Sequence, residues 1–336
     1  MISRFVSKIF ERLFQKKGNY AGMTTFPIGL VLFPPPAQRV LSTIKLAEQA
    51  GIPMAWVPSW PVGPDGLAIV TAAAAQTSRI GLGTSITITY PRHPLTLANE
   101  ALVLAEIAPQ RIRLGLGASH RPEIEGTYGL DFAKPLGHLR EYITVLRGLL
   151  WEGAIDFEGD YYRVHARYPQ GTPLPRFPIW LAALRKNMLR LAGELSDGAM
   201  LIWSPPSYIR SVALPMLEEG ARQAGRARPP LMVSAPLLLT KDFGVVRRLA
   251  QESFAVYSRF PTYRKLFEEA GYPLPSDGKL PEELIDSVFV YGDEDEIRRR
   301  MYAKREAGAD EIMATVRPIH DAEKETRALL EVLASL

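Results

Sequence analysis

Hydroxyl-bearing residues gather where one strand-like stretch of the chain comes to an end. The stretch IGLGTSITITYPRHP, residues 80–94, alternates apolar residues with small or hydroxylated ones and then stops at a Pro-Arg-His-Pro segment. Proline cannot donate to a sheet ladder and restricts the residue before it, so this strand must end near Tyr90. Parallel strands in α/β proteins place their chemistry at their carboxyl ends. Ser85 and Thr87 are therefore candidates for ligand contacts.

Two later strand-like stretches end in small or hydrogen-bonding residues as well. RIRLGLGAS (111–119) and FPIWLAA (177–183) are the stretches, and each runs into a loop. A helix N-terminus with adjacent cations suits a phosphate group. Together, the residues at these strand ends indicate a binding site at one end of a barrel of strands. The site would hold a large, flat, phosphate-bearing cofactor and would supply no nucleophile of its own. Its members are Gly117, Ser119 and His120 after the first stretch, and Ala182, Ala183, Arg185 and Lys186 after the second.

Signatures of other enzyme classes are missing from the sequence. There is no P-loop, no Gly-x-Ser-x-Gly elbow and no His-Glu-x-x-His pair, and the five histidines show no metal-ligand spacing. The chain has no cysteine, which excludes disulfides, thiolate metal sites and a cysteine nucleophile. The Gly-Leu-Gly at 115–117 is only a fragment of a dinucleotide fingerprint. It indicates a strand end where backbone approaches a ligand or a neighbouring strand closely.

The elements that position these residues alternate between strand-like and helix-like patterns. Eight strand–helix units over about 310 residues predict a (β/α)8 barrel, a TIM barrel with insertions, in preference to a doubly wound sheet. One insertion near 155–165 has the alternation and turn of a hairpin. The other, near 241–292, is helical and is expected to be a lid or a dimer element. The eight predicted strands lie at 26–33, 54–58, 80–90, 111–119, 177–183, 198–203, 231–240 and 310–316.

Basic charge is concentrated in a short leader, residues 1–22. The leader carries five basic residues and one acidic residue, and removing them from the totals of 40 and 36 leaves 35 of each. A neutral body argues against a nucleic-acid partner, which would need a basic face. No run approaches the roughly 18 apolar residues of a spanning helix. We therefore expect a cytoplasmic protein with one barrel domain over 23–336.

The leader itself has an amphipathic pattern. Over residues 1–17 the apolar residues form one helical stripe with the cations opposite. Such a helix can lie in a membrane interface or dock on a partner. Three other interpretations stay open: the leader packs on the body, it packs on a second subunit of a homodimer, or it is an upstream extension before a start at Met23.

Several segments together resemble the bacterial luciferase-like monooxygenase superfamily, and most of all its branch that uses the deazaflavin coenzyme F420. The likeness covers roughly residues 26–316 and rests on six segments in matching order and spacing. These are TSRIGLGTSITITYPRHP, RIRLGLGASH, LREYITVLRGLL, DFEGDYYRV, PIWLAALRKNMLRLAGELSDGAM and VYGDEDEIRRRMYAKREAGADEI.

The resemblance implies a TIM barrel with the cofactor at its C-terminal mouth. It implies a non-proline cis peptide at Ser85–Ile86 that backs the cofactor ring, with Phe33 and Trp60 at the substrate. The sequence departs from the family pattern twice. Leu-Arg-Lys-Asn replaces the Gly or Gly-Pro that often follows the fifth strand. Ser59 and Trp60 replace an acid and a histidine of the sugar-phosphate dehydrogenases, which argues against a sugar-phosphate substrate.

Two classes of function follow from these observations. The first is an oxidoreductase that transfers a hydride between coenzyme F420 and a small organic substrate, with an FMN-dependent monooxygenase fed by a separate reductase as a variant. In both, the cofactor carries the chemistry and the protein positions it. The second is a barrel that does not catalyse a reaction. It binds a cofactor or a partner, and the leader is its contact with a membrane. If Arg185 and Lys186 do not hold the phosphate, Ser119 and His120 are the alternative.

Overall fold

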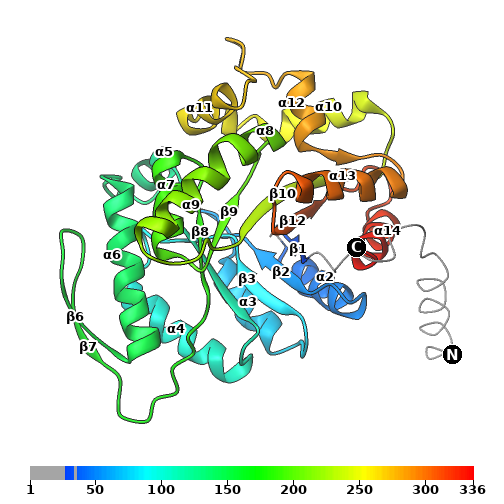
Figure 1. Cartoon of the computed structure of the whole chain (residues 1–336). Coiled ribbons are helices and arrows are strands. Elements are labelled where there is room, and N and C mark those ends of the chain that lie inside the picture. Colours follow the sequence, from blue (N-terminus) through cyan, green and yellow to red (C-terminus); the bar gives the residue numbers. More distant parts are fainter. Residues whose placement is uncertain (1–26, 34–35) are drawn as a thin grey trace, which may run out of the picture.

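Eight parallel strands close into a barrel in the computed structural model, which describes residues 27–33 and 36–336 (Figure 1). The last strand pairs with the first, with Ile312 opposite Ile28, so the sheet has no free edge between them. This closure confirms the predicted TIM barrel over the doubly wound sheet. In order around the ring, the strands are β1 (Ile28–Val31), β2 (Met54–Val57), β3 (Gly81–Thr84), β5 (Ile112–Gly117), β8 (Ile179–Ala182), β9 (Gly198–Leu201), β10 (Leu231–Leu238) and β12 (Glu311–Val316).

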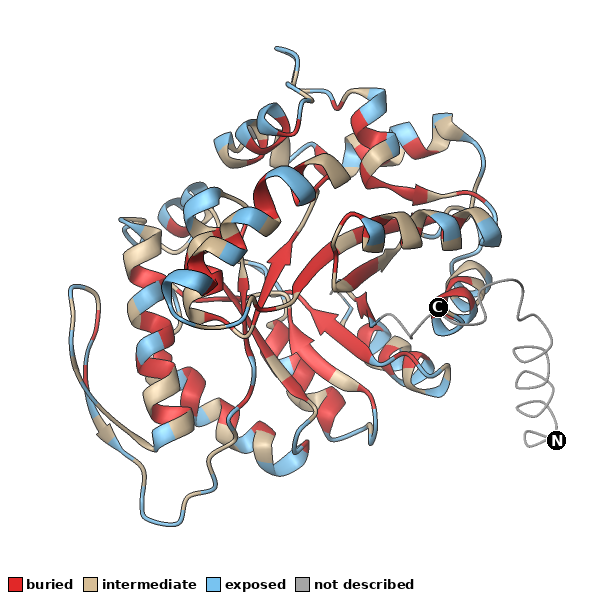
Figure 2. Ribbon diagram, viewed as in Figure 1, coloured by how far each residue is buried: buried red, intermediate tan, exposed pale blue. Residues whose placement is uncertain are grey.

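Helices cover the outside of the barrel and turn their apolar faces inward (Figure 2). In the first of these helices, α2 (Ala37–Gln49), the buried residues are Val40, Ile44 and Ala47. Their spacing keeps them on one face of the helix. The outer helices are α2 (Ala37–Gln49), α3 (Gly66–Ala74), α4 (Pro94–Ile107), α5 (Arg121–Gly126), α6 (Pro135–Arg147), α7 (Lys186–Leu195), α8 (Pro206–Tyr208), α9 (Leu214–Gln223), α13 (Glu294–Glu306) and α14 (Ala322–Ala334). Two π-helical turns, η1 (Gly148–Glu152) and η2 (Ile209–Ala213), extend α6 and connect α8 to α9.

Both predicted excursions from the barrel are present. The hairpin consists of β6 (Ala154–Glu158) and β7 (Arg163–Arg167), which pair antiparallel and project beside α6 (Figure 1). The insertion lies between β10 and α13, above the barrel in the view of Figure 1. It contains α10 (Phe243–Phe254), the short helix η3 (Tyr257–Arg259), α11 (Pro261–Glu269), α12 (Glu282–Val288) and β11 (Val290–Tyr291), which extends the sheet beside β10.

Large side chains fill the inside of the barrel. The rings of Trp56 and Trp180 meet edge to face with their centroids 5.9 Å apart. Glycines opposite them make room: a Cβ at Gly83 would lie 2.5 Å from the Trp56 ring, and one at Gly198 would lie 2.3 Å from the Trp180 ring. The barrel is therefore a packed core with a layer of tryptophan and methionine. Its buried members are Val31, Met54, Trp56, Trp180, Met200, Met232 and Met313.

The leader lies outside the described residues. Its predicted apolar stripe over 1–17 and its boundary at 22 stay predictions, and the expected first strand is described only from Pro27 onward. Across the described ranges, no helix combines the length and apolar character needed to cross a membrane.

One buried lysine stands out in the helical layer. Lys304 of α13 is 2% exposed, and its Nζ has no hydrogen-bond partner within the described part of the chain. Burial, together with the charge of the neighbouring Arg300, lowers the pKa of Lys304 to about 8. Removing an ammonium group from water without pairing it costs free energy. The charged form of Lys304 therefore destabilises the folded chain.

We expect Lys304→Met to raise the free energy of unfolding by about 3 kcal/mol at pH 7. This is the free energy that corresponds to the difference between the ordinary lysine pKa of 10.5 and the value of about 8 in the folded chain. The unfolded lysine binds more protons than the folded one between pH 8 and the ordinary value of 10.5. The wild-type chain therefore gains stability as the pH rises through this range, and the advantage of the variant disappears above it. Urea unfolding at several pH values measures the difference. The exposed Lys324 in α14 gives the control, Lys324→Met, which should change little. A destabilised Lys304→Met would contradict this account.

Candidate functional site

The third predicted strand is two strands joined by a bend. After β3 ends at Thr84, the chain passes through a cis peptide bond between Ser85 and Ile86 and continues as β4 (Thr87–Ile88). The cis bond is confirmed at the position that the family resemblance indicates. Both pieces pair with β5, so the bend projects from the carboxyl end of the barrel beside that strand.

Two glycines of β5 allow this bend to lie close. A Cβ on Gly115 would be 1.9 Å from the carbonyl oxygen of Thr84, and one on Gly117 would be 2.3 Å from Cδ1 of Ile86. The Thr84 hydroxyl donates to the Gly115 carbonyl at 2.8 Å and accepts from its N–H at 3.1 Å. The Gly-Leu-Gly segment therefore serves a close approach of a neighbouring strand, one of the two roles predicted for it.

The four hydroxyls of the bend divide into two kinds. Those of Thr84 and Thr89 are used within the barrel, since Thr89 Oγ1 donates to the Gly117 carbonyl at 3.3 Å. Ser85 Oγ and Thr87 Oγ1 are buried with no hydrogen-bond partner among the described residues. Thr87 is only 1% exposed. A buried hydroxyl without a partner costs free energy, and a bound polar group would remove that cost.

A histidine outside the predicted site supports the bend from behind. His138 Nε2 lies 3.0 Å from Thr89 Oγ1, and the tautomer of the ring decides which of the two atoms donates the hydrogen bond. Burial lowers the pKa of His138 to about 4, which keeps it neutral. Its ring stacks on Tyr90 with centroids 3.8 Å apart. His138 was missed as a site residue because its partner lies 49 residues away, with no local motif to indicate the contact.

His120 lies under the aromatic side chains of the insertion. It follows Ser119, which has a left-handed backbone with a φ of 60° and donates a hydrogen bond from its hydroxyl to Glu123. The ring of His120 stacks on Phe260 with centroids 4.2 Å apart, and Tyr263 lies 5.7 Å away. Burial lowers the pKa of His120, so the imidazole is neutral near pH 7. The insertion thus covers this strand end.

The two predicted cations lie together at the start of α7. This helix begins at Lys186, and no side chain caps its N-terminus. Arg185 forms a two-pronged ion pair with Glu269, with distances of 3.1 and 2.7 Å, and Lys186 Nζ lies 3.7 Å from the same carboxylate. Glu269 ends α11 in the insertion, 84 residues away from Arg185. No local motif indicates this partner, because the contact depends on how the insertion folds back.

The remaining predicted residues lie at neighbouring strand ends. Ala182 ends β8, and its Cβ is 3.3 Å from the place that a Cβ on Gly117 would take. Ala183 is buried and donates its N–H to the Met200 carbonyl at 2.9 Å. Phe33 and Trp60 follow β1 and β2, and their rings are brought to 6.2 Å between centroids. These rings are 44% and 37% exposed, which is unusual for large apolar groups and fits a surface that a ligand covers.

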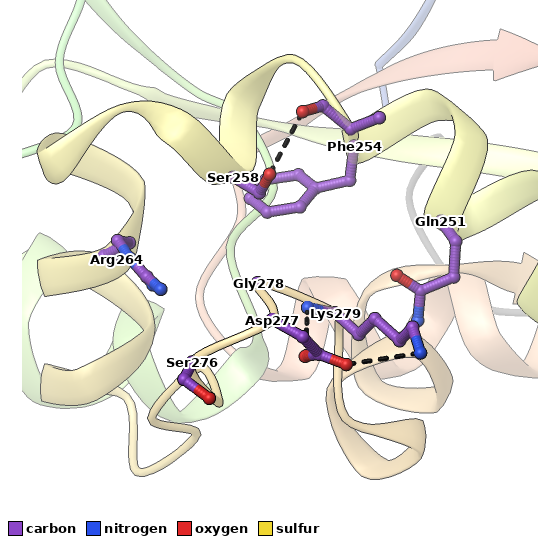
Figure 3. A pocket seen from close by; sticks show the side chains of 9 residues that line it. Gln251, Phe254, Ser258, Arg264, Ser276, Asp277, Gly278 and Lys279 are labelled. Carbon is purple, nitrogen blue, oxygen red and sulfur yellow. Dashed lines mark hydrogen bonds and ion pairs between the residues drawn. The ribbon is translucent and has the colours of Figure 1, made fainter.

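One cavity, of about 520 Å³, lies within the insertion (Figure 3). Its lining comes from α10, η3, α11 and the loop at 276–279, and Phe254 forms its apolar wall. The Phe254 ring also contacts Trp203, with centroids 5.3 Å apart, so it stands between this cavity and the end of β9. Within the described residues there is no group of three or more metal-ligating side chains. The strand ends therefore remain the candidate site.

Comparison with known proteins places the chain in a family. The profile of the luciferase-like monooxygenase family matches residues 9–311. The chain therefore belongs to the luciferase-like monooxygenase family.

Two curated relatives carry names that describe an activity. The chain is 32% identical over 216 residues to a 5,10-methylenetetrahydromethanopterin reductase of Methanopyrus kandleri, a match that spans 59% of this chain and 60% of the reductase. It is 27% identical over 320 residues to a putative coenzyme F420-dependent oxidoreductase of Mycobacterium tuberculosis, over 83% and 91% of the two chains. The chain thus spans less than two thirds of the Methanopyrus reductase, and 63% of an uncharacterised protein of Mycobacterium bovis that is 30% identical.

Solved structures share the fold. An F420-dependent secondary alcohol dehydrogenase in complex with an F420-acetone adduct has a TM-score of 0.78 at 20% identity, over 93% of this chain and 99% of the other. The oxygenating constituent of 3,6-diketocamphane monooxygenase from Pseudomonas putida, in complex with FMN, has a TM-score of 0.72 at 21% identity, over 93% and 97%. At these identities the likeness establishes the barrel fold.

We expect Gly115→Ala to destabilise the chain by roughly 3 kcal/mol or more, at the upper end of the cost of overpacking. The new Cβ would overlap the Thr84 carbonyl, which is backbone and cannot move without shifting β3. Urea unfolding measures the change. Gly126→Ala is the control, since a Cβ at Gly126 meets nothing within 4 Å. Equal stability of the two variants would show that β3 and β5 are not in close contact.

Proposed function

We propose that this protein is an oxidoreductase that transfers a hydride between coenzyme F420 and a small organic substrate at the C-terminal mouth of its barrel. The name of the Mycobacterium tuberculosis relative and that of the secondary alcohol dehydrogenase that shares the fold support the cofactor. The observation that carries the proposal is the pair of buried, unpartnered hydroxyls, Ser85 Oγ and Thr87 Oγ1, on the two sides of Ile86. In this proposal they bond a polar heterocycle.

The residues at the mouth fit a flat ring with a phosphate. Ser85 and Thr87 would bond the edge of the ring, and the small Gly117 and Ala182 make room for Ile86 of the bend. The uncapped start of α7, with Arg185 and Lys186, would hold the phosphate. When bound, the deazaflavin supplies the carbon centre that gives or takes the hydride. The protein supplies position, hydrogen bonds and exclusion of water.

Substrate binding falls to the exposed aromatic pair. Phe33 and Trp60 would cover an apolar part of the substrate, and both reach solvent from adjacent strand ends. His120 is the neutral imidazole at this rim, and it can accept the proton released when an alcohol-like donor loses its hydride. Phe260 stacks on His120 and keeps bulk water from it. We therefore assign proton transfer to His120 within this proposal.

The FMN-dependent monooxygenase remains the second candidate, because an FMN-bound monooxygenase shares the barrel over 97% of its length. A single titration distinguishes the two. We expect the protein to bind coenzyme F420 more tightly than FMN, with the change in cofactor fluorescence as the measure. Tighter binding of FMN would support the monooxygenase. Binding of neither cofactor would support the interpretation that the barrel does not catalyse a reaction.

Arg185→Ala should weaken F420 binding by about 1–3 kcal/mol, or roughly 5- to 150-fold in the dissociation constant, the usual scale for a hydrogen bond to a charged group. The matched control is Arg140→Ala. Arg140 also pairs with a glutamate, Glu194, but near the other end of α7. The control should bind like the wild type. An unchanged affinity of Arg185→Ala for F420 would indicate that Ser119 and His120 hold the phosphate instead.

Thr87→Val should change stability and cofactor affinity in opposite directions. Without cofactor, the variant removes an unpartnered buried hydroxyl and should be as stable as the wild type or more stable, by about 1 kcal/mol. With cofactor, it loses a hydrogen bond, so the dissociation constant should rise about tenfold. Thr84→Val is the control, because its hydroxyl is bonded to Gly115 and its loss should destabilise the free protein. Destabilisation of free Thr87→Val would contradict the assignment.

A further inference from the structure

The end of the barrel opposite the mouth holds a second cavity, of about 550 Å³. The residues around it begin strands: Ile28 begins β1, Met54 begins β2 and Glu311 begins β12. It is therefore separate from the strand ends described above, with the layer of Trp56 and Trp180 between the two. Nothing in the proposed hydride transfer uses this cavity.

Positive charge dominates the lining of this cavity. Four arginines and one glutamate line it, and the formal charges leave an excess of three positive charges. The lining also contains apolar groups, which include prolines and Phe177. Its charged members are Arg79, Arg111, Arg113, Arg176 and Glu311.

Only one of the four guanidinium groups is paired with an acid of the lining. Arg113 forms a two-pronged pair with Glu311 at 3.0 and 2.7 Å. Arg111 donates to the carbonyls of Ala74, Thr77 and Ile80 and to the Thr77 hydroxyl, all neutral acceptors, so its charge is not cancelled. These two arginines are part of the framework of the cavity.

The other two arginines are available to a ligand. Arg79 is exposed, and its guanidinium donates no hydrogen bond to any described residue. The acid next to it, Glu48, accepts three backbone N–H groups, at 2.7 to 3.1 Å, and its charge attracts Arg79 without a hydrogen bond to the guanidinium. Arg176 is exposed and makes one long contact of 3.4 Å, to the Trp151 carbonyl.

Backbone conformation sets this cavity apart as well. Five non-glycine residues in the described ranges have a positive φ, and two of them, Gln110 at 63° and Arg176 at 43°, line this cavity. Two others, Ser119 and Trp203, follow the strand ends of the mouth. Such conformations cost free energy and are concentrated at ligand sites. The cavity thus shares a property of the candidate active site.

We infer that this cavity binds an organic phosphate, with Arg79 and Arg176 as its main contacts. With the neighbouring Glu48 counted, an excess of two positive charges remains, which a dianion matches better than a single carboxylate does. The planar guanidinium fork also matches phosphate oxygens. A volume of about 550 Å³ exceeds what a lone phosphate fills, and the apolar lining around Phe177 accommodates the organic part. The ligand is either a soluble phosphate ester or the headgroup of a phospholipid.

Calorimetric titration of the full chain with phenyl phosphate tests this inference. Because Arg185 is proposed to hold a phosphate at the mouth, every variant carries Arg185→Ala, which weakens binding there. We expect phenyl phosphate to bind, inorganic phosphate to bind more weakly, and benzyl alcohol, which lacks the charge, not to bind. Adding Arg79→Ala or Arg176→Ala should each weaken binding at least fivefold. Arg79→Lys and Arg176→Lys should weaken it less, since they keep the charge and lose the fork.

Arg248→Ala is the matched control. Arg248 is an exposed arginine of α10 in the insertion, with Glu252 at 4.0 Å, and its loss should leave phenyl phosphate binding unchanged. Thermal unfolding of each variant shows whether it is folded. Two results would overturn the inference: no binding of phenyl phosphate to the Arg185→Ala chain, or binding that Arg79→Ala and Arg176→Ala leave unchanged in folded protein. Neither result depends on the cofactor at the mouth.

Vesicles distinguish the two sources of the phosphate. The same variants are sedimented with vesicles of phosphatidylcholine, with and without phosphatidate. If Arg79→Ala and Arg176→Ala reduce the binding that phosphatidate adds, the ligand is a lipid headgroup. If they abolish phenyl phosphate binding and leave vesicle binding unchanged, it is a soluble ester. Both outcomes support the cavity as a phosphate site.

Discussion

The close approach of β3 to β5 at Gly115 is the constraint on which the candidate site depends. There is no space for a Cβ between Gly115 and the Thr84 carbonyl, and the Thr84 hydroxyl bonds both backbone groups of that glycine. The bend that follows can then pair with β5 a second time through Thr87. This arrangement holds Ser85 and Thr87 in their buried positions. The proposed contacts with the cofactor depend on these two residues.

Much of this architecture was predictable from local patterns. The period of the apolar residues indicated the eight strands and the helices between them, and the proline after Tyr90 indicated where the third strand ends. Placement of Arg185 and Lys186 at a helix start followed from the same reasoning and is confirmed. These features depend on residues close together in the chain, where periodicity and turn chemistry are informative.

Contacts between distant segments were not predictable in this way. Glu269 pairs with Arg185 from 84 residues away, and His138 contacts Thr89 from 49 residues away. Neither has a motif, because a glutamate at a helix end or a histidine in a helix is usually solvated or packed. The division of the third strand into β3 and β4 was also missed as a secondary-structure feature, although the family resemblance placed the cis bond correctly. Local patterns also could not show which of the four hydroxyls lack a partner, because that depends on the position of β5.

The ion pair between Arg185 and Glu269 joins two parts of the molecule that are otherwise separate in sequence. Arg185 belongs to the barrel and Glu269 to the insertion, which leaves the barrel after β10 and returns to it at β11. An anion that binds Arg185 competes with Glu269 for the same guanidinium. Occupancy of the proposed phosphate position and attachment of the insertion would therefore be thermodynamically linked. The linkage is reciprocal: whatever loosens α11 makes the cations more available, and an anion that occupies them loosens α11.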